Sequence, residues 1–306
     1  GVMMMLATQG SSKQLNLRQA FLLTILVWVI LPGIAALPMA FSVLDLSYTD
    51  AYFEAMSGLT TTGSTVIVGL DHAPPGILLW RAILQWLGGI GVVVMAIAIL
   101  PMLQIGGMQL FKTESFDTSE KILPRAGQIS SAISGLYVAF TALCAILMML
   151  VGLSPFDAIV HAMTSIATGG FSTSDASIGQ YDSIAVEMVS LTFILIGSLP
   201  FILYLQILRG RTLALWRDQQ VKTFFITLLC LISLVTSWLV IFKGFTLGEA
   251  LRYGGFNIIS IMTGTGYAST NYMLWGSFPV ALLFFTGLIG GCAGSTARSV
   301  KIFRYQ

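Results

Sequence analysis

Long apolar stretches alternate with short polar segments along this 306-residue chain. Stretches of about twenty apolar residues can cross a bilayer core of roughly 30 Å as helices. We expect such spans near 19–41, 76–102, 132–152, 183–208, 223–242 and from 275 to the C-terminus. The last one is interrupted by Gly290, Gly291, Gly294 and Ser295. The pattern predicts an all-α polytopic membrane protein.

Shorter apolar stretches lie in the connections between spans one and two, three and four, and five and six. They cover 50–59, 156–166 and 247–262, and each ends in a Thr/Gly/Ser cluster, at 60–65, 167–173 and 263–270. Gly63, Gly170 and Gly266 mark a period of 107 and then 96 residues. The unit that repeats three times is therefore a span, a short half-helix, a Thr/Gly loop and a second span.

Composition supports the membrane assignment. The chain is 56% hydrophobic and 9% charged, with a mean hydropathy of +0.88 and a net charge of +2. A water-exposed surface needs about 25% charged residues, and nothing here has the basic patch of a nucleic-acid binder. Cys144, Cys230 and Cys292 lie far apart in apolar sequence, and we interpret them as packing residues.

The charged residues predict the orientation. Basic residues collect before the first span, between 208 and 222 and at the C-terminus, which places these segments in the cytoplasm. On the other side, 42–75 and 153–187 hold eight acidic residues and no Lys or Arg. We expect a negative outer mouth that concentrates cations.

The Thr/Gly loops point to a chemistry. A half-helix that enters the membrane and returns as an extended loop leaves backbone carbonyls unpaired, and a dehydrated monovalent cation can replace its water with such oxygens. A divalent cation would require clustered carboxylates, and the loop cores hold none. Close helix packing by small residues is the alternative, but three matched loops on one side favour ion binding.

Two motifs carry a family resemblance. WRAILQWLGGIG at 80–91, following TTTG at 60–63, is similar to the RxxxQWxGGxG signature of the TrkH/KtrB/HKT superfamily of potassium transporters, closest to its bacterial TrkH branch. GGCAGST at 290–296, with Lys301, resembles the superfamily's loop in the third repeat. The resemblance covers essentially the whole chain.

The resemblance implies potassium uptake through a carbonyl-lined selectivity filter in the bacterial inner membrane, with potassium as substrate and no cofactor in this chain. It implies filter residues Thr61, Thr62, Gly63, Thr168, Gly169, Gly170, Gly264, Thr265 and Gly266. Gly169 competes with Gly170 as the second filter glycine, and Phe171 in the place of Tyr267 favours Gly170. A loop of Gly290, Gly291, Cys292, Ala293, Gly294, Ser295 and Thr296 would gate the path.

The implied partners are the lipid bilayer, a second copy in a homodimer and a cytosolic nucleotide-binding regulatory subunit similar to TrkA, with no nucleic acid. The segments become 1–18, the end of a preceding helix and a cytoplasmic linker; pore repeats at 19–102, 132–208 and 223–306; and cytoplasmic links at 103–131 and 209–222.

The chain departs from the family pattern in two places. The family has a fourth repeat, so we expect either a fragment or a second chain that completes the pore. Ala297-Arg298-Ser299 also stands where the family usually has glycines, which leaves the behaviour of the gate open.

For several single residues the sequence allows two roles. Arg81 either pairs with an acidic residue such as Glu54 or extends to the interface. Gln85 and Trp86 either bond the filter backbone or only pack, and His161 is more often a structural donor than a proton carrier. Arg298 and Lys301 are either cytoplasmic anchors or a positive barrier below the filter.

Other functions remain as alternatives. Sodium permeation or cation-coupled symport is one, since related members with Ser at the first filter glycine handle sodium; Gly63 favours potassium. A membrane enzyme or a transporter with a midplane site would need clustered ionisable residues inside the spans, and the expected spans have none. A structural scaffold would leave the three loops unexplained.

Overall fold

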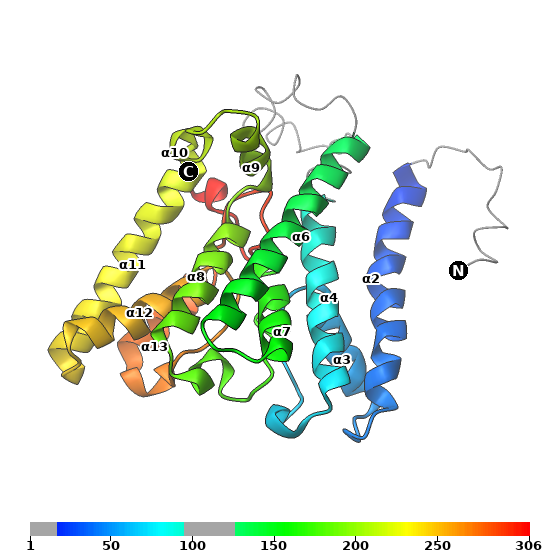
Figure 1. Ribbon diagram of the computed structural model, residues 1–306, viewed down its shortest axis with the longest axis horizontal. Coiled ribbons are helices and arrows are strands. Elements are labelled where there is room, and N and C mark those ends of the chain that lie inside the picture. Colours follow the sequence, from blue (N-terminus) through cyan, green and yellow to red (C-terminus); the bar gives the residue numbers. More distant parts are fainter. Residues whose placement is uncertain (1–16, 95–125) are drawn as a thin grey trace.

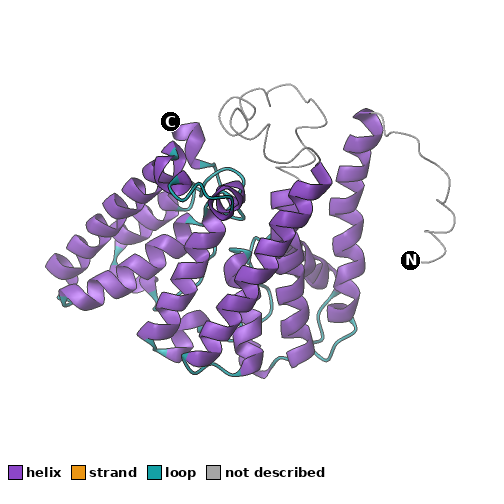
Figure 2. Cartoon of the chain, turned by 45° about the horizontal axis from the view of Figure 1, so that its top comes forward, coloured by secondary structure: helices purple, strands orange, loops and turns teal. Residues whose placement is uncertain are grey.

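The computed structural model describes residues 17–94 and 126–306, and α-helices dominate both ranges (Figures 1 and 2). The longer helices are α2 (Leu17–Ala40), α3 (Tyr48–Leu59), α4 (Pro75–Val94), α6 (Ala126–Leu150), α7 (Pro155–Ile166), α8 (Ile184–Ser198), α9 (Phe201–Leu208), α11 (Gln219–Lys243), α12 (Leu247–Met262) and α13 (Ser277–Thr286). Short helical turns are η1 (Leu70–His72), η4 (Ser177–Tyr181), α10 (Ala214–Arg217), η5 (Tyr272–Trp275) and η6 (Ile302–Tyr305). The expected linkers 1–18 and 103–131 lie, except for their last residues, outside the described residues.

Two expected spans differ from the structure. Three helices in the described ranges are long and apolar enough to cross a membrane: α4, most of α6, and α11. The span expected at 183–208 is instead the pair α8 and α9, bent by 92° at Leu199 and Pro200. Proline disfavours helical geometry in the residue before it, and Leu199 is extended. The stretch expected from 275 onward is helical for ten residues in α13, too short to cross.

The three half-helices α3, α7 and α12 begin in the same way. Each has a hydroxyl residue as N-cap and an acidic residue three positions later, in the pairs Ser47 and Asp50, Ser154 and Asp157, and Thr246 and Glu249. In each pair the hydroxyl oxygen accepts a hydrogen bond from the backbone N–H of the acidic residue, at 3.1 to 3.3 Å. Such caps satisfy the free N–H groups of a helix start. They fix where each half-helix begins.

Apolar side chains face outward as well as inward. A central cluster from α6, α7, α8 and α9 includes Tyr137, Phe193 and Phe201, all almost fully buried. In contrast, α2 and α11 expose large apolar residues such as Ile34 and Leu229, at 59% and 67%. A soluble protein rarely exposes so wide an apolar surface, and the outward faces suit a lipid environment.

The two edges of the molecule are distinct. In Figure 1 the basic turn around α10 and the C-terminus lie at the upper edge, and the turns before α3 and α7 lie at the lower edge. This separation agrees with the charge pattern, from which the positive-inside rule predicts a cytoplasmic location for the segments at the upper edge. Cys230 is exposed rather than packed, so the expectation for that residue is wrong, while Cys144 and Cys292 are buried.

One ion pair lies inside the first repeat and another joins the second and third repeats. Arg81 of α4 contacts Glu54 of α3 at 2.7 Å, and both side chains are at most 1% exposed. Of the two roles left open for Arg81, the ion pair is the one present. Arg252 of α12 contacts Glu187 and Asp182 of the preceding repeat at 2.8 Å. Glu54 and Glu187 are therefore neutralised inside the protein, and the outer mouth is less negative than the sequence suggested.

The Glu54 and Arg81 pair predicts a stability effect. Arg81→Met would leave the Glu54 carboxylate buried and unpaired, which costs about 3–5 kcal/mol, so we expect a clear drop in thermal unfolding temperature in detergent. The double variant Glu54→Met with Arg81→Met removes both charges and should lose less than Arg81→Met alone. Equal stability of the wild type and Arg81→Met would contradict the prediction.

Candidate functional site

The three Thr/Gly loops share one unusual backbone conformation. In each loop the residue two positions before the expected filter glycine and the glycine itself have positive φ, while the residue between them does not. The pairs are Thr61 (φ 55°) and Gly63 (72°), Thr168 (48°) and Gly170 (79°), and Gly264 (79°) and Gly266 (84°). Alternating left- and right-handed residues turn successive carbonyls toward the same side. Gly169 lacks the positive φ, so Gly170 is the residue in register with Gly63 and Gly266.

The N–H groups of these loops are tied back to the half-helices. In each repeat the carbonyl six residues before the filter glycine accepts hydrogen bonds from the loop: Ser57 from Thr62 at 2.8 Å, Thr164 from Gly169 at 2.9 Å, and Ser260 from Gly266 at 3.1 Å. Two of these residues also hold the returning loop of their own repeat with their hydroxyls, since Ser57 donates to Ser64 O at 2.6 Å and Ser260 to Tyr267 O at 2.7 Å. With the N–H groups held on one side, the loop carbonyls are free to face the other.

Carbonyls of all three repeats converge on one point. The guanidinium of Arg298 donates to the carbonyls of Thr62, Thr168 at 3.3 Å and Thr265 at 3.5 Å. A single side chain can reach all three only if they line a common space. The half-helices also end at this space, because their C-caps Thr60, Ala167 and Thr263 lead directly into the loops. The negative ends of helix dipoles favour a cation there.

The loops interlock in sequence order. A Cβ at Gly63 would overlap the carbonyl oxygen of Gly169, and a Cβ at Gly170 would overlap that of Thr265. Glycine is thus required at both positions by close approach as well as by φ. A Cβ at Gly266 would meet no atom of the described residues within 4 Å. The third loop therefore has an open flank among the described residues.

Two side chains of α4 support the second loop. Gln85 donates to Gly169 O at 2.8 Å and accepts from Phe171 N at 3.1 Å. Arg81 donates to Ser172 O at 3.2 Å and lies 4.0 Å from the centre of the Phe171 ring. The Gly169 carbonyl therefore has a protein donor, unlike an ion ligand that faces only the axis. Trp86 bonds Thr141 instead of the filter.

His161 is a structural donor or acceptor in this arrangement. It is fully buried, with Nδ1 2.9 Å from Asp157 O and Nε2 3.0 Å from Ser172 Oγ. Both ring nitrogens are used within the second repeat, which holds the strand after Gly170 against α7.

The loop 290–296 is bound to the break between α8 and α9. Cys292 N donates to Ser198 O at 3.1 Å, Phe201 N to Gly294 O at 3.0 Å, and Thr296 N to Gly197 O at 3.0 Å. Thr296 Oγ1 also lies 2.9 Å from the carbonyls of Ile166 and Gly197. The bend at Pro200 thus exposes backbone groups that the loop satisfies. These bonds place Thr296 against Ile166, the last residue of α7.

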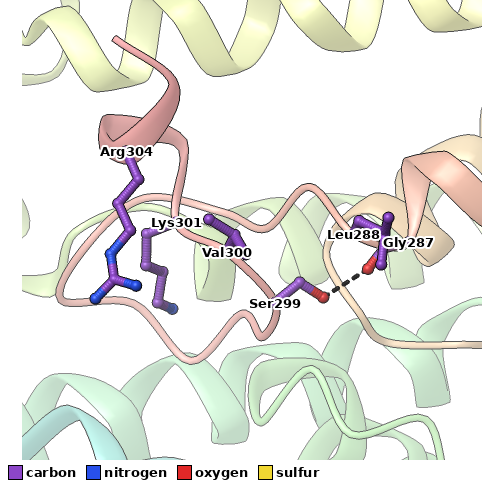
Figure 3. A pocket seen from close by; sticks show the side chains of 6 residues that line it. All are labelled: Gly287, Leu288, Ser299, Val300, Lys301 and Arg304. Carbon is purple, nitrogen blue, oxygen red and sulfur yellow. Dashed lines mark hydrogen bonds between the residues drawn. The ribbon is translucent and has the colours of Figure 1, made fainter.

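Arg298 and Lys301 have different positions. Arg298 is partly buried at the three loops, while Lys301 donates to Ala297 O. Lys301 and Arg304 line a cavity of about 340 Å³ with Gly287, Leu288, Ser299 and Val300, where Ser299 Oγ bonds Gly287 O at 2.7 Å (Figure 3). In the described residues no group of three His, Cys, Asp or Glu side chains could hold a metal ion.

Sequence reasoning missed several of these contacts. The positions Ser57, Thr164 and Ser260 repeat with the spacing of the filter glycines, and that shared spacing was a usable signal. Pro200 inside an apolar stretch was a second usable signal, in this case for the break between α8 and α9. The contact of Arg298 with Thr62 joins residues 236 positions apart, and no local pattern predicts it.

Comparisons with known proteins agree with this architecture. A family model described as TrkH, cation transport protein, matches residues 2–306. The chain is 48% identical over 289 residues to the Trk system potassium uptake protein TrkI of Halomonas elongata, covering 94% of this chain and 58% of that protein. It is 38% identical to TrkH of Escherichia coli K12, covering 99% and 64%.

A solved structure is similar as well. The crystal structure of the potassium transporter TrkH from Vibrio parahaemolyticus matches with a TM-score of 0.84 at 37% identity, over 97% of this chain and 61% of that one. The chain thus spans about 60% of the length of these relatives. With a family model matched along nearly its full length and the fold of a solved relative, the chain belongs to the TrkH family of cation transport proteins.

Proposed function

We propose that this chain forms three quarters of a potassium-selective uptake path. Potassium sheds its water at the carbonyls of the loops around Gly63, Gly170 and Gly266, and the loop 290–296 controls passage below them. The observation that carries the proposal is the convergence of Thr62, Thr168 and Thr265 carbonyls on one positive group. Oxygens that bind a guanidinium without a carboxylate suit a monovalent cation.

The path is completed outside the described residues. The open flank beside Gly266 is where a fourth carbonyl strand would fit, and the relatives are longer than this chain. We extend the proposal to a homodimer in the bacterial inner membrane and to a cytosolic nucleotide-binding subunit of the TrkA kind. The relatives' names as Trk system proteins favour such an assembly.

Sodium is the second candidate cargo. Related members with Ser at the first filter glycine handle sodium, whereas this chain has Gly63 there, and its three filter glycines share one backbone conformation. We therefore favour potassium over sodium, and transport over an enzymatic reaction. His161 and Glu54, two buried ionisable residues of the half-helices, are held by protein partners, which speaks against either of them as the site of a coupled second ion.

The first test is a matched pair of glycine substitutions. The φ values of Gly63 and Gly69 are 72° and 78°, and asparagine tolerates this region. At Gly63 the new side chain would collide with the Gly169 carbonyl, whereas at Gly69 it meets nothing within 4 Å. In cells lacking potassium uptake, we expect Gly63→Asn in the protein containing this chain to lower rubidium influx at least tenfold, and Gly69→Asn to preserve it.

The outcome separates the cargoes. Sodium added in excess should leave rubidium influx through the wild type largely unchanged. Equal influx through both variants, or no influx through the wild type, would sink the filter assignment, and strong sodium competition would favour the second candidate.

The gate has its own matched pair. Thr296→Val keeps the shape of the side chain but removes the hydroxyl bonds to Ile166 and Gly197. Thr286→Val makes the same change at a buried threonine whose hydroxyl bonds only within its helix, to Leu282 O. We expect Thr296→Val to raise basal rubidium flux in proteoliposomes several-fold and Thr286→Val to leave it unaltered. Identical flux in both variants would argue against the loop as the gate.

A further inference from the structure

Arg298 lies where a permeating ion would have to pass. Its Nη1 bonds the Thr62 carbonyl and its Nη2 bonds those of Thr168 and Thr265. Thr62 and Thr265 directly precede their filter glycines, and Thr168 stands two positions before Gly170. The guanidinium therefore sits at the end of the loops nearest the half-helix C-termini and spans all three repeats.

The surroundings of Arg298 are shaped to hold it. Gly264 occupies the position that Thr61 and Thr168 occupy in the other loops, and a Cβ there would come within 3.0 Å of the Arg298 Cβ and 3.2 Å of its Nε. Arg298 N donates to Thr263 O at 3.2 Å, and Gly290 leaves room for the Arg298 carbonyl. The one loop without threonine at this position is the loop against which Arg298 packs.

The chemistry of the two cations makes them competitors. A guanidinium is a permanent cation with five N–H donors in a planar fork and no acceptor, so it bonds carbonyl oxygens from several directions. A dehydrated potassium ion needs the same oxygens as ligands. Because like charges repel strongly in a low-dielectric setting, the two cannot occupy adjoining positions at the same carbonyls without a large cost.

We propose that the inner end of the carbonyl path is a guanidinium-binding site, filled in the closed state by Arg298 of the chain itself as a tethered blocking cation. Transport then requires the 290–301 segment to withdraw this side chain, and an ion entering from the outer side helps to expel it. The inference rests on the proposed path and adds the identity of its blocker. It also gives a direction to the block, because ions arriving from the cytoplasmic side push Arg298 toward the carbonyls.

Removal and replacement of the guanidinium tests the site. The protein containing this chain is reconstituted in proteoliposomes, and rubidium flux is compared for the wild type, Arg298→Gly and Arg304→Gly. We expect Arg298→Gly to raise basal flux at least fivefold and to reduce the preference for inward over outward flux. Arg304, an exposed cation three residues beyond this segment, should give wild-type flux when replaced by glycine.

Chemical complementation distinguishes a blocking role of Arg298 from a purely structural one, because added guanidinium would change rubidium flux only if the side chain acts as a blocker. Guanidinium chloride at millimolar concentration should restore the block in Arg298→Gly and have little effect on the wild type. Tetramethylammonium, a cation without N–H donors, should not restore it at the same concentration. Arg298→Lys keeps the charge without the fork, so we expect intermediate flux.

The failures are distinguishable. If the wild type carries no rubidium at all, even with its regulatory subunit, the proposed path itself is wrong. If the wild type transports but Arg298→Gly matches it and guanidinium has no selective effect, the tethered cation is overturned. Should Arg298→Gly not assemble in the membrane, wild-type flux and rectification in Arg298→Lys would overturn it equally.

Discussion

The site depends on the different partners of the backbone N–H and C=O groups in each Thr/Gly loop. Loop N–H groups bond the half-helix carbonyl that lies six residues before each filter glycine, at Ser57, Thr164 and Ser260. The loop carbonyls are left without such a partner. In a membrane an unpaired carbonyl is costly, so the arrangement is stable only if a cation or a donor fills the space they surround. Every other feature of the site either fixes this backbone or supplies the positive charge.

Rigid support follows from that requirement. An oxygen ring that binds ions must hold its geometry while the ion leaves, and the loops have few side chains with which to do so. The protein supplies the stiffness from outside through the Glu54 and Arg81 pair, the Gln85 amide and His161, all buried. Their contacts cross from one repeat to the next or from half-helix to returning strand. The buried charges thus hold the loops in place, and the loop cores themselves contain no charged side chain.

Sequence patterns predicted the repeated elements well because these depend on local chemistry. The half-helices expected at 50–59, 156–166 and 247–262 appear at Tyr48–Leu59, Pro155–Ile166 and Leu247–Met262. Their C-terminal ends were predictable because each apolar stretch stops at a Thr/Gly cluster. The break at Pro200 was missed because hydropathy continues across it. The pairing of Glu54 was only one of two options, and the location of Arg298 was not predictable at all. Both depend on how segments more than 25 residues apart pack, which periodicity does not encode.

The position of Arg298 also says something about the carbonyl path itself. Burying a charged side chain in apolar surroundings costs free energy unless its protein partners compensate for the lost hydration. Arg298 has no carboxylate partner among the ion pairs of the described residues, and its Nε has no hydrogen bond in that part of the chain. Three carbonyls and three half-helix C-termini are what stabilise it. Carbonyl oxygens and helix C-termini create a negative potential without a fixed negative charge. A monovalent cation in the same space would be attracted by this potential but not held by a carboxylate, and it could therefore leave again. The low share of charged residues, 9% of the chain, is compatible with a site of this kind, because its negative potential comes from the backbone.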